Sequence, residues 1–143
     1  MTFRSCIKSA ALALALTLVV NTVTADVVAV VSSASTITQL SKTQVTDIFL
    51  GKVSHFPDGT LAIPIDQAEG SPVRDEFYAT VTSKSPAQVK AYWAKIIFTG
   101  RGQPPKAVSN SIDVRKLLAA SPQAIGYIER SAVDSSVRVL VQP

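Results

Sequence analysis

The spacing of apolar residues changes along the chain, and each change predicts a different element. Residues 27–31 (VVAVV) form a continuous β-branched run, which is typical of a strand buried on both faces. Apolar runs at 61–65, 124–129 and 137–141 predict three further strands. Because Pro64 cannot donate to a β ladder, we expect the strand at 61–65 at a sheet edge or at an interruption.

Four other segments repeat their apolar residues every three or four positions, as a helix with one buried face does. Ser41 and Ser85 are each followed three residues later by Gln, so both begin predicted capping boxes. Ser71 precedes a proline, a favourable pair for a helix start, and Ser109 or Ser111 is expected to cap the last helix. The expected buried positions are Val45, Ile48 and Phe49, then Val73, Phe77 and Val81, then Val89, Tyr92, Trp93, Ile96 and Ile97, and finally Val114, Leu117 and Leu118.

The predicted order is strand, helix, strand, three helices and two strands. Short apolar strands interspersed with amphipathic helices favour one α/β domain, in which a short mixed sheet is flanked by helices. No internal repeat interrupts this order after residue 26.

The first residues have the pattern of a secretory signal peptide. Residues 1–25 begin with two cations and no acid, continue with an uncharged apolar run at 10–20, and end small-x-small before Asp26. Eleven helical residues reach about 16 Å, too short for the ~30 Å core of a bilayer. We therefore expect cleavage between Ala25 and Asp26, leaving a periplasmic or secreted domain at 26–143 that does not span a membrane.

Composition excludes several classes of function. Loss of the leader lowers the formal net charge from +4 to +2, and no basic run of five or more remains, which disfavours nucleic acid as a partner. The only cysteine, Cys6, lies before the apolar run, so we expect neither a disulfide nor a lipid anchor. One histidine, His55, cannot form a metal cluster, no Gly-x-Ser-x-Gly motif is present, and nothing indicates a cofactor; the residues predict no enzyme.

Five segments in order resemble the periplasmic phosphate-binding-protein family of bacterial uptake systems, the PstS-like type II periplasmic binding proteins. The resemblance implies a single lobe of that fold, an exported solute-binding module, phosphate or a similar oxyanion as ligand, and a membrane transporter as partner. Proteins of that family bind their ligand between two lobes, whereas this chain has the residues for about one. The matching segments are LSKTQVTDIFLGK (40–52), FPDGT (56–60), EGSPVRDEFY (69–78), YWAKIIFTGRGQPP (92–105) and PQAIGYIE (122–129).

The family's phosphate loop reads Arg-x-Asp-Gly-Ser-Gly-Thr, and this chain departs from it. Gly70 and Ser71 match that motif, but Gln67 stands where the family has arginine. Pro72 removes a backbone donor and Val73 removes a hydroxyl, so the resemblance implies weaker anion binding here than in the family.

Considered by themselves, these residues still form a candidate anion site. Gly70 and Ser71 open a predicted helix, whose free N–H groups and partial positive charge attract anions. Arg74 in the first turn could add a bidentate contact, with Gln67 as a polar helper. The simpler interpretation, which we favour, is that Ser71 is only a cap and that neighbouring Asp75, Glu76 or Glu69 neutralises the arginine.

Two other groups are weaker candidates for contact with a ligand. Ser35 and Thr36 follow the first buried strand, where α/β folds place ligands, although an ordinary polar turn explains them equally simply. Arg101, between two glycines, could touch a partner or be merely solvated.

Two hypotheses of function follow, and the enzyme hypothesis ranks last. The first is an oxyanion-binding module. The alternative is a protein-interaction or sensory accessory that has lost high-affinity phosphate binding and docks onto a membrane sensor, a transporter or a second copy of itself.

Overall fold

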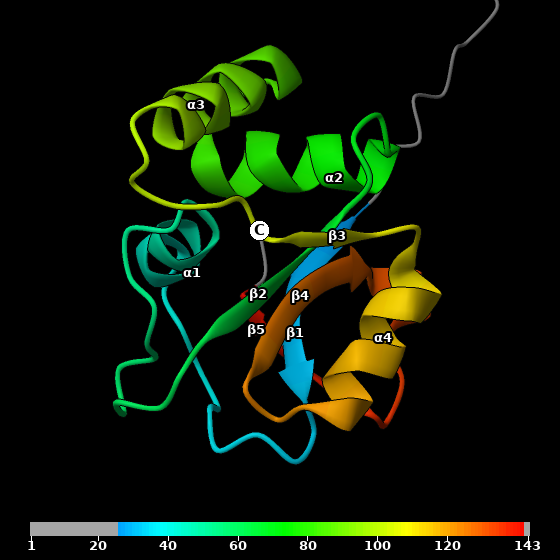
Figure 1. Ribbon diagram of the computed structural model, residues 1–143. Coiled ribbons are helices and arrows are strands. Elements are labelled where there is room, and N and C mark those ends of the chain that lie inside the picture. Colours follow the sequence, from blue (N-terminus) through cyan, green and yellow to red (C-terminus); the bar gives the residue numbers. More distant parts are fainter. Residues whose placement is uncertain (1–25, 142–143) are drawn as a thin grey trace, which may run out of the picture.

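A five-stranded mixed sheet in the order β3-β2-β4-β1-β5 organises the chain (Figure 1). The structure is a computed structural model that describes residues 26–141, so the predicted signal peptide lies outside the described residues. The strands are β1 (Val27–Ser32), β2 (Ile63–Gln67), β3 (Lys106–Val108), β4 (Ala124–Glu129) and β5 (Val137–Val141). The helices are α1 (Lys42–Phe49), α2 (Pro72–Phe77) with the π-helical turn η1 (Tyr78–Thr82), α3 (Pro86–Phe98), α4 (Ser111–Ala120) and the short η2 (Arg130–Ala132).

Strand directions decide which loops share an edge of the sheet. β2 runs parallel to both β3 and β4, whereas β1 is antiparallel to both β4 and β5. The carboxyl ends of β2, β3 and β4 therefore meet at one edge, and β1 ends at the opposite edge.

Helices cover both faces of the sheet, which explains why β1 is buried throughout, as predicted. On one face Val27, Ala29 and Val31 join the core under α1, α2, η1 and α3. On the other face Val28 and Val30 pack with residues of α4. The strand alternates between two cores, so it needs no polar face.

The helix starts follow the predicted caps with one exception. Ser41 and Ser85 form the two expected capping boxes, and Ser71 caps α2. The cap of α4 is Asn110, not Ser109 or Ser111; its side chain accepts from the Asp113 N–H. The side-chain oxygen of asparagine caps a helix as well as a serine hydroxyl does. The prediction of a serine cap at position 109 or 111 was therefore wrong.

One further expectation is met and two details differ from the predicted elements. No strand was predicted at β3, which has only three residues and no apolar alternation. Pro64 lies in an interior strand at an interruption of its pairing, as expected, because β3 pairs only with residues 65–67 and leaves the proline without a β3 partner. Ile97 was expected to be buried but is 48% exposed, because α3 ends at the rim of the molecule.

Within residues 26–141, none of the helices is both long enough and apolar enough to cross a bilayer.

Candidate functional site

A hollow of about 340 Å³ lies at the edge where β2, β3 and β4 end. Two helices begin there side by side, because α2 follows β2 and α4 follows the parallel neighbour β3. Their first turns supply most of the lining, and the remainder comes from the strand ends and from η2. The lining residues are Gln67, Ser71, Pro72, Val73, Ser109, Asn110, Ser111, Ile112, Glu129 and Ala132.

Next to the lining residue Gln67, the carboxylate of Asp66 is buried near the end of β2. It accepts hydrogen bonds from the hydroxyl of Tyr78 at 2.9 Å, from the hydroxyl of Tyr127 and from the Gln67 N–H at 2.9 Å. Burial, and then the negative charge of Asp66, raises the pKa of both phenols well above the usual value. The two tyrosines therefore stay protonated and act as fixed donors to this carboxylate.

The side-chain nitrogen of Gln67 makes two hydrogen bonds that hold the fold. Its Nε2 donates to the backbone oxygen of Tyr127 at 3.0 Å and to the Oγ of Ser111 at 3.3 Å. The amide thus ties the end of β2 to β4 and to the first residue of α4. Since the Ser111 oxygen accepts this bond, its own O–H is left to donate into the hollow.

The start of α2 offers little to an anion. Gly70 adopts φ +87°, which turns the chain into the Ser71 cap. Ser71 Oγ accepts from the Arg74 N–H at 3.4 Å, and Ser71 O accepts from the Asp75 N–H at 3.0 Å. Pro72 has no N–H, so Val73 has the only N–H of this turn for which residues 26–141 provide no acceptor.

Arg74 is turned away from the hollow. Its Nε lies 3.4 Å from Oδ2 of Asp66, its guanidinium stacks 5.0 Å from the centre of the Tyr78 ring, and its side chain is only 12% exposed. The simpler interpretation expected Asp75, Glu76 or Glu69 to neutralise this arginine, but the partner is Asp66. Glu69 instead pairs with Lys90 at 3.2 Å.

Ser35 and Thr36 lie at the opposite edge of the sheet, because β1 runs against β4. Ser35 Oγ is buried and accepts from the Ile37 N–H, and Thr36 Oγ1 donates to Oδ2 of Asp58. The structure therefore brings Gly70, Ser71 and Gln67 together at one edge and leaves these two residues at the other.

Sequence reasoning missed the part of the site that comes from α4. Ser109 and Ser111 were considered only as caps and Asn110 was not considered, although all three line the hollow together with Ser71. Two caps preceding two helices were visible in the sequence. What was missing was the short strand β3, whose parallel pairing with β2 places those caps beside each other.

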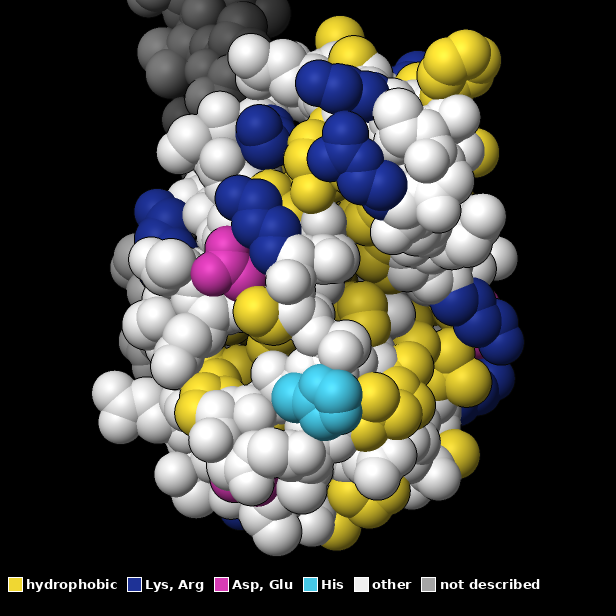
Figure 2. Space-filling model, turned by 60° about the vertical axis from the view of Figure 1, so that its left-hand side comes forward, with side chains coloured by type: hydrophobic (Ala, Val, Ile, Leu, Met, Phe, Trp, Pro, Cys, Tyr) yellow, Lys and Arg dark blue, Asp and Glu magenta, His cyan; other side chains and the backbone are white. Residues whose placement is uncertain are grey.

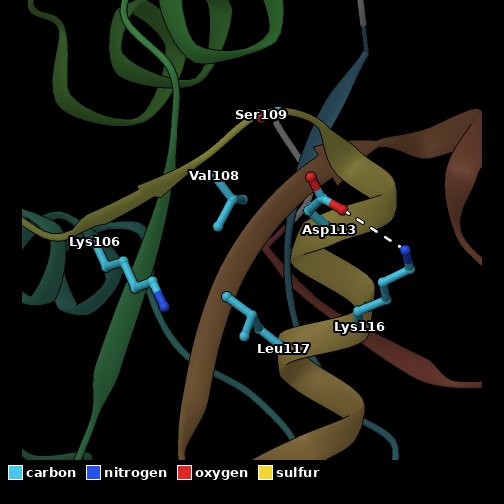
Figure 3. A pocket seen from close by; sticks show the side chains of 6 residues that line it. All are labelled: Lys106, Val108, Ser109, Asp113, Lys116 and Leu117. Carbon is cyan, nitrogen blue, oxygen red and sulfur yellow. Dashed lines mark ion pairs between the residues drawn. The ribbon is translucent and has the colours of Figure 1, made fainter.

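A second cavity, of about 320 Å³, lies between β3 and α4 (Figure 3). Val108 and Leu117 form its apolar floor, and Lys106 points toward it from the strand. Lys116 is occupied by Asp113, with Nζ 3.9 Å from Oδ1. Within residues 26–141, no three Asp, Glu, His or Cys side chains form a group that could hold a metal ion.

No protein-family model matches the sequence, and neither does any curated protein. Solved structures do match at the level of the fold. One is a Clostridium perfringens protein described as a phosphate ABC transporter substrate-binding protein with bound phosphate. It is 23% identical to this chain with a TM-score of 0.62, and the match covers 80% of this chain and 44% of the Clostridium chain. An ABC-type phosphate transport receptor from Vibrio cholerae is 18% identical with TM-score 0.63, covering 80% and 45%. PstS from Borrelia burgdorferi is 13% identical with TM-score 0.53, covering 80% and 46%.

These matches concern the fold, and this chain spans less than half the length of those solved structures. The five-stranded sheet flanked by helices has the fold of one lobe of the phosphate-binding proteins, as the resemblance in the sequence implied.

Proposed function

We propose that this chain is a solute-binding-protein-like module without enzymatic activity, exported to the periplasm, which binds phosphate or a similar oxyanion weakly in the hollow between the starts of α2 and α4. The observation that carries the proposal is that the start of α4 and the one N–H of the α2 start left free within residues 26–141, that of Val73, meet at a hollow that also has the hydroxyls of Ser71, Ser109 and Ser111 on its lining. Helix starts and hydroxyls are donors suited to an oxyanion. The solved neighbours of the same fold are described as phosphate-transport proteins, which supports this class of ligand.

The affinity should be low for two physical reasons. The arginine of the α2 start, Arg74, is held by Asp66, and the Glu129 side chain on the lining repels an anion. The hollow is also open to solvent, so a bound ion would keep much of its contact with water.

Calorimetric titration with phosphate and with sulfate tests this proposal. We expect a dissociation constant in the high micromolar to millimolar range for the unaltered protein. Ser109→Asp places a negative charge in the hollow and should abolish the heat, whereas Ser33→Asp makes the same change at the opposite edge of the sheet and should leave it unchanged. Absence of heat for both anions at 10 mM, or equal effects of the two variants, would contradict oxyanion binding in this hollow.

The second candidate function is a protein-interaction or sensory accessory. The ion pair between Asp66 and Arg74 favours it, because this pair removes from solvent the cation that would serve high-affinity phosphate binding. A protein that gives no heat with either anion, yet retains a sensor or transporter component from the membranes of its own organism, would support this candidate over the first.

A further inference from the structure

The end of α3 carries the most exposed large hydrophobic side chain of the described residues. Phe98 is 91% exposed, and its neighbour Ile97 is 48% exposed. The helix lies at the outside of the molecule, beyond α2 as seen from the sheet (Figure 1). Burial of Val89 and Trp93 anchors its inner face, so the two apolar residues project outward from a fixed helix.

The backbone after Phe98 holds this tip in one conformation. Gly100 adopts φ +68°, the Gly100 N–H donates to the oxygen of Ile97, and the Arg101 N–H donates to the oxygen of Ile96, both at 3.1 Å. This is the pattern of a Schellman cap. It places Arg101 directly beyond the apolar tip instead of in a free loop.

The segment around the tip contains basic residues and no acidic residue. Residues 77–112 contain five cations and no acidic residue. Lys90 pairs with Glu69, and Lys84 lies over the ring of Tyr92. Lys95 and Arg101 flank the tip, and no acidic residue within 26–141 pairs with either of them. Figure 2 shows Lys and Arg side chains gathered over one half of the face that contains α3, with hydrophobic side chains among them and little acidic surface between.

We propose that the end of α3 attaches the protein peripherally to an anionic lipid surface, with Phe98 and Ile97 entering the interfacial region and Lys95 and Arg101 contacting lipid phosphates. A projecting apolar tip fits a soft lipid interface better than a protein partner, which would need a broad complementary surface. Each Lys or Arg side chain close to an anionic membrane strengthens binding of the protein to that membrane about fivefold. This inference does not depend on oxyanion binding in the hollow.

Vesicle sedimentation tests the proposed attachment to lipid. The protein is purified in the form that the cell accumulates, and its N-terminus is determined by mass spectrometry. Vesicles of 70% phosphatidylcholine and 30% phosphatidylglycerol should sediment the protein at 50 mM salt, and vesicles of phosphatidylcholine alone should not. Phe98→Ser should weaken binding at least tenfold. The control Leu61→Ser, which alters a side chain that is 43% exposed just before β2, should leave binding unchanged.

A second pair of variants separates charge from apolar contact. Lys95→Gln with Arg101→Gln should weaken binding to the anionic vesicles about 25-fold. Lys42→Gln with Lys116→Gln removes the same charge elsewhere and should weaken it less than threefold. Introducing tryptophan as Phe98→Trp should give a blue-shifted emission on anionic vesicles. No sedimentation with anionic vesicles, equal binding to neutral ones, or equal effects of variant and control would overturn the proposal.

Discussion

Asp66 holds Arg74 from the end of β2, with the Nε of the arginine 3.4 Å from Oδ2 of the carboxylate. The carboxylate also accepts from two tyrosine hydroxyls, so its charge is compensated by several donors at once. The arginine has only this acidic partner among the described residues. The two members of the pair therefore contribute unequally to stability.

Removal of Asp66 should be far more damaging than removal of Arg74. Asp66→Ala leaves a buried cation and two buried phenols without their acceptor, and we expect it to lower the free energy of unfolding by about 3–5 kcal/mol. Arg74→Met leaves the carboxylate with three donors and should lower it by about 1–2 kcal/mol. Urea unfolding followed by the fluorescence of Trp93 measures both losses. Equal losses would contradict the unequal contributions of the two residues.

The buried phenols make a prediction about alkaline pH. The pKa of Tyr78 and of Tyr127 is raised in the folded state, so these groups stabilise the protein fully below the unfolded pKa of about 10. Above that pH the unfolded state loses protons that the folded state retains. The free energy of unfolding should then fall by about 2–3 kcal/mol per pH unit for the two groups together.

Urea unfolding between pH 8 and pH 11 measures this slope, and absorbance at 295 nm reports phenolate in the folded state. Tyr127→Phe should roughly halve the slope. A slope that is the same in this variant and in the unaltered protein would mean that other groups govern alkaline unfolding.

The sequence was informative for the two capping boxes and for the first strand, where the residues of the segment itself decide the structure. Capping boxes at Ser41 and Ser85 need only two side chains three residues apart, and both formed as predicted. The β-branched run of β1 is apolar on both faces because two layers of helices cover it, which a sequence can signal without a partner.

The candidate site was only partly predictable, because it depends on pairing between distant residues. Gln67 and Ser71 were recognised, yet the α4 side of the hollow follows from the three-residue strand β3 and its parallel register with β2. Ser35 lies at the opposite edge of the sheet because β1 runs antiparallel to β4. The composition of the strand does not encode this direction. The partner of Arg74 was misjudged for a different reason: Asp66 lies at the end of β2, across the turn that leads into α2, and the stacking of Arg74 on Tyr78 accompanies its contact with Asp66.

The cap of α4 should contribute measurable stability. Asn110→Ala removes the acceptor of the Asp113 N–H and should lower the free energy of unfolding by about 1 kcal/mol. Ser109→Ala is the matched control, because the predicted cap at that position did not form, and it should change stability by less than about 0.5 kcal/mol. A larger loss for Ser109→Ala than for Asn110→Ala in urea unfolding would contradict the assignment of the cap.

Gly126 should be the least replaceable glycine of the described residues, although its backbone is ordinary. A Cβ added at Gly126 would lie 2.5 Å from Cγ1 of Val114, where α4 packs on β4. At Gly70 the backbone has φ +87°, but an added Cβ would meet nothing within 4 Å. Gly126→Ala should therefore lower the free energy of unfolding by about 2–3 kcal/mol, and Gly70→Ala by about 1 kcal/mol.

The double variant Gly126→Ala with Val114→Ala distinguishes steric overlap from a backbone effect. Val114 is fully buried, so Val114→Ala alone leaves a cavity and should cost about 2 kcal/mol. In the double variant the new methyl group at position 126 enters the space that the valine vacated. Its loss should be smaller than the sum of the two single losses by at least about 1 kcal/mol. Additive losses in urea unfolding would mean that Gly126 is required for a reason other than its contact with α4.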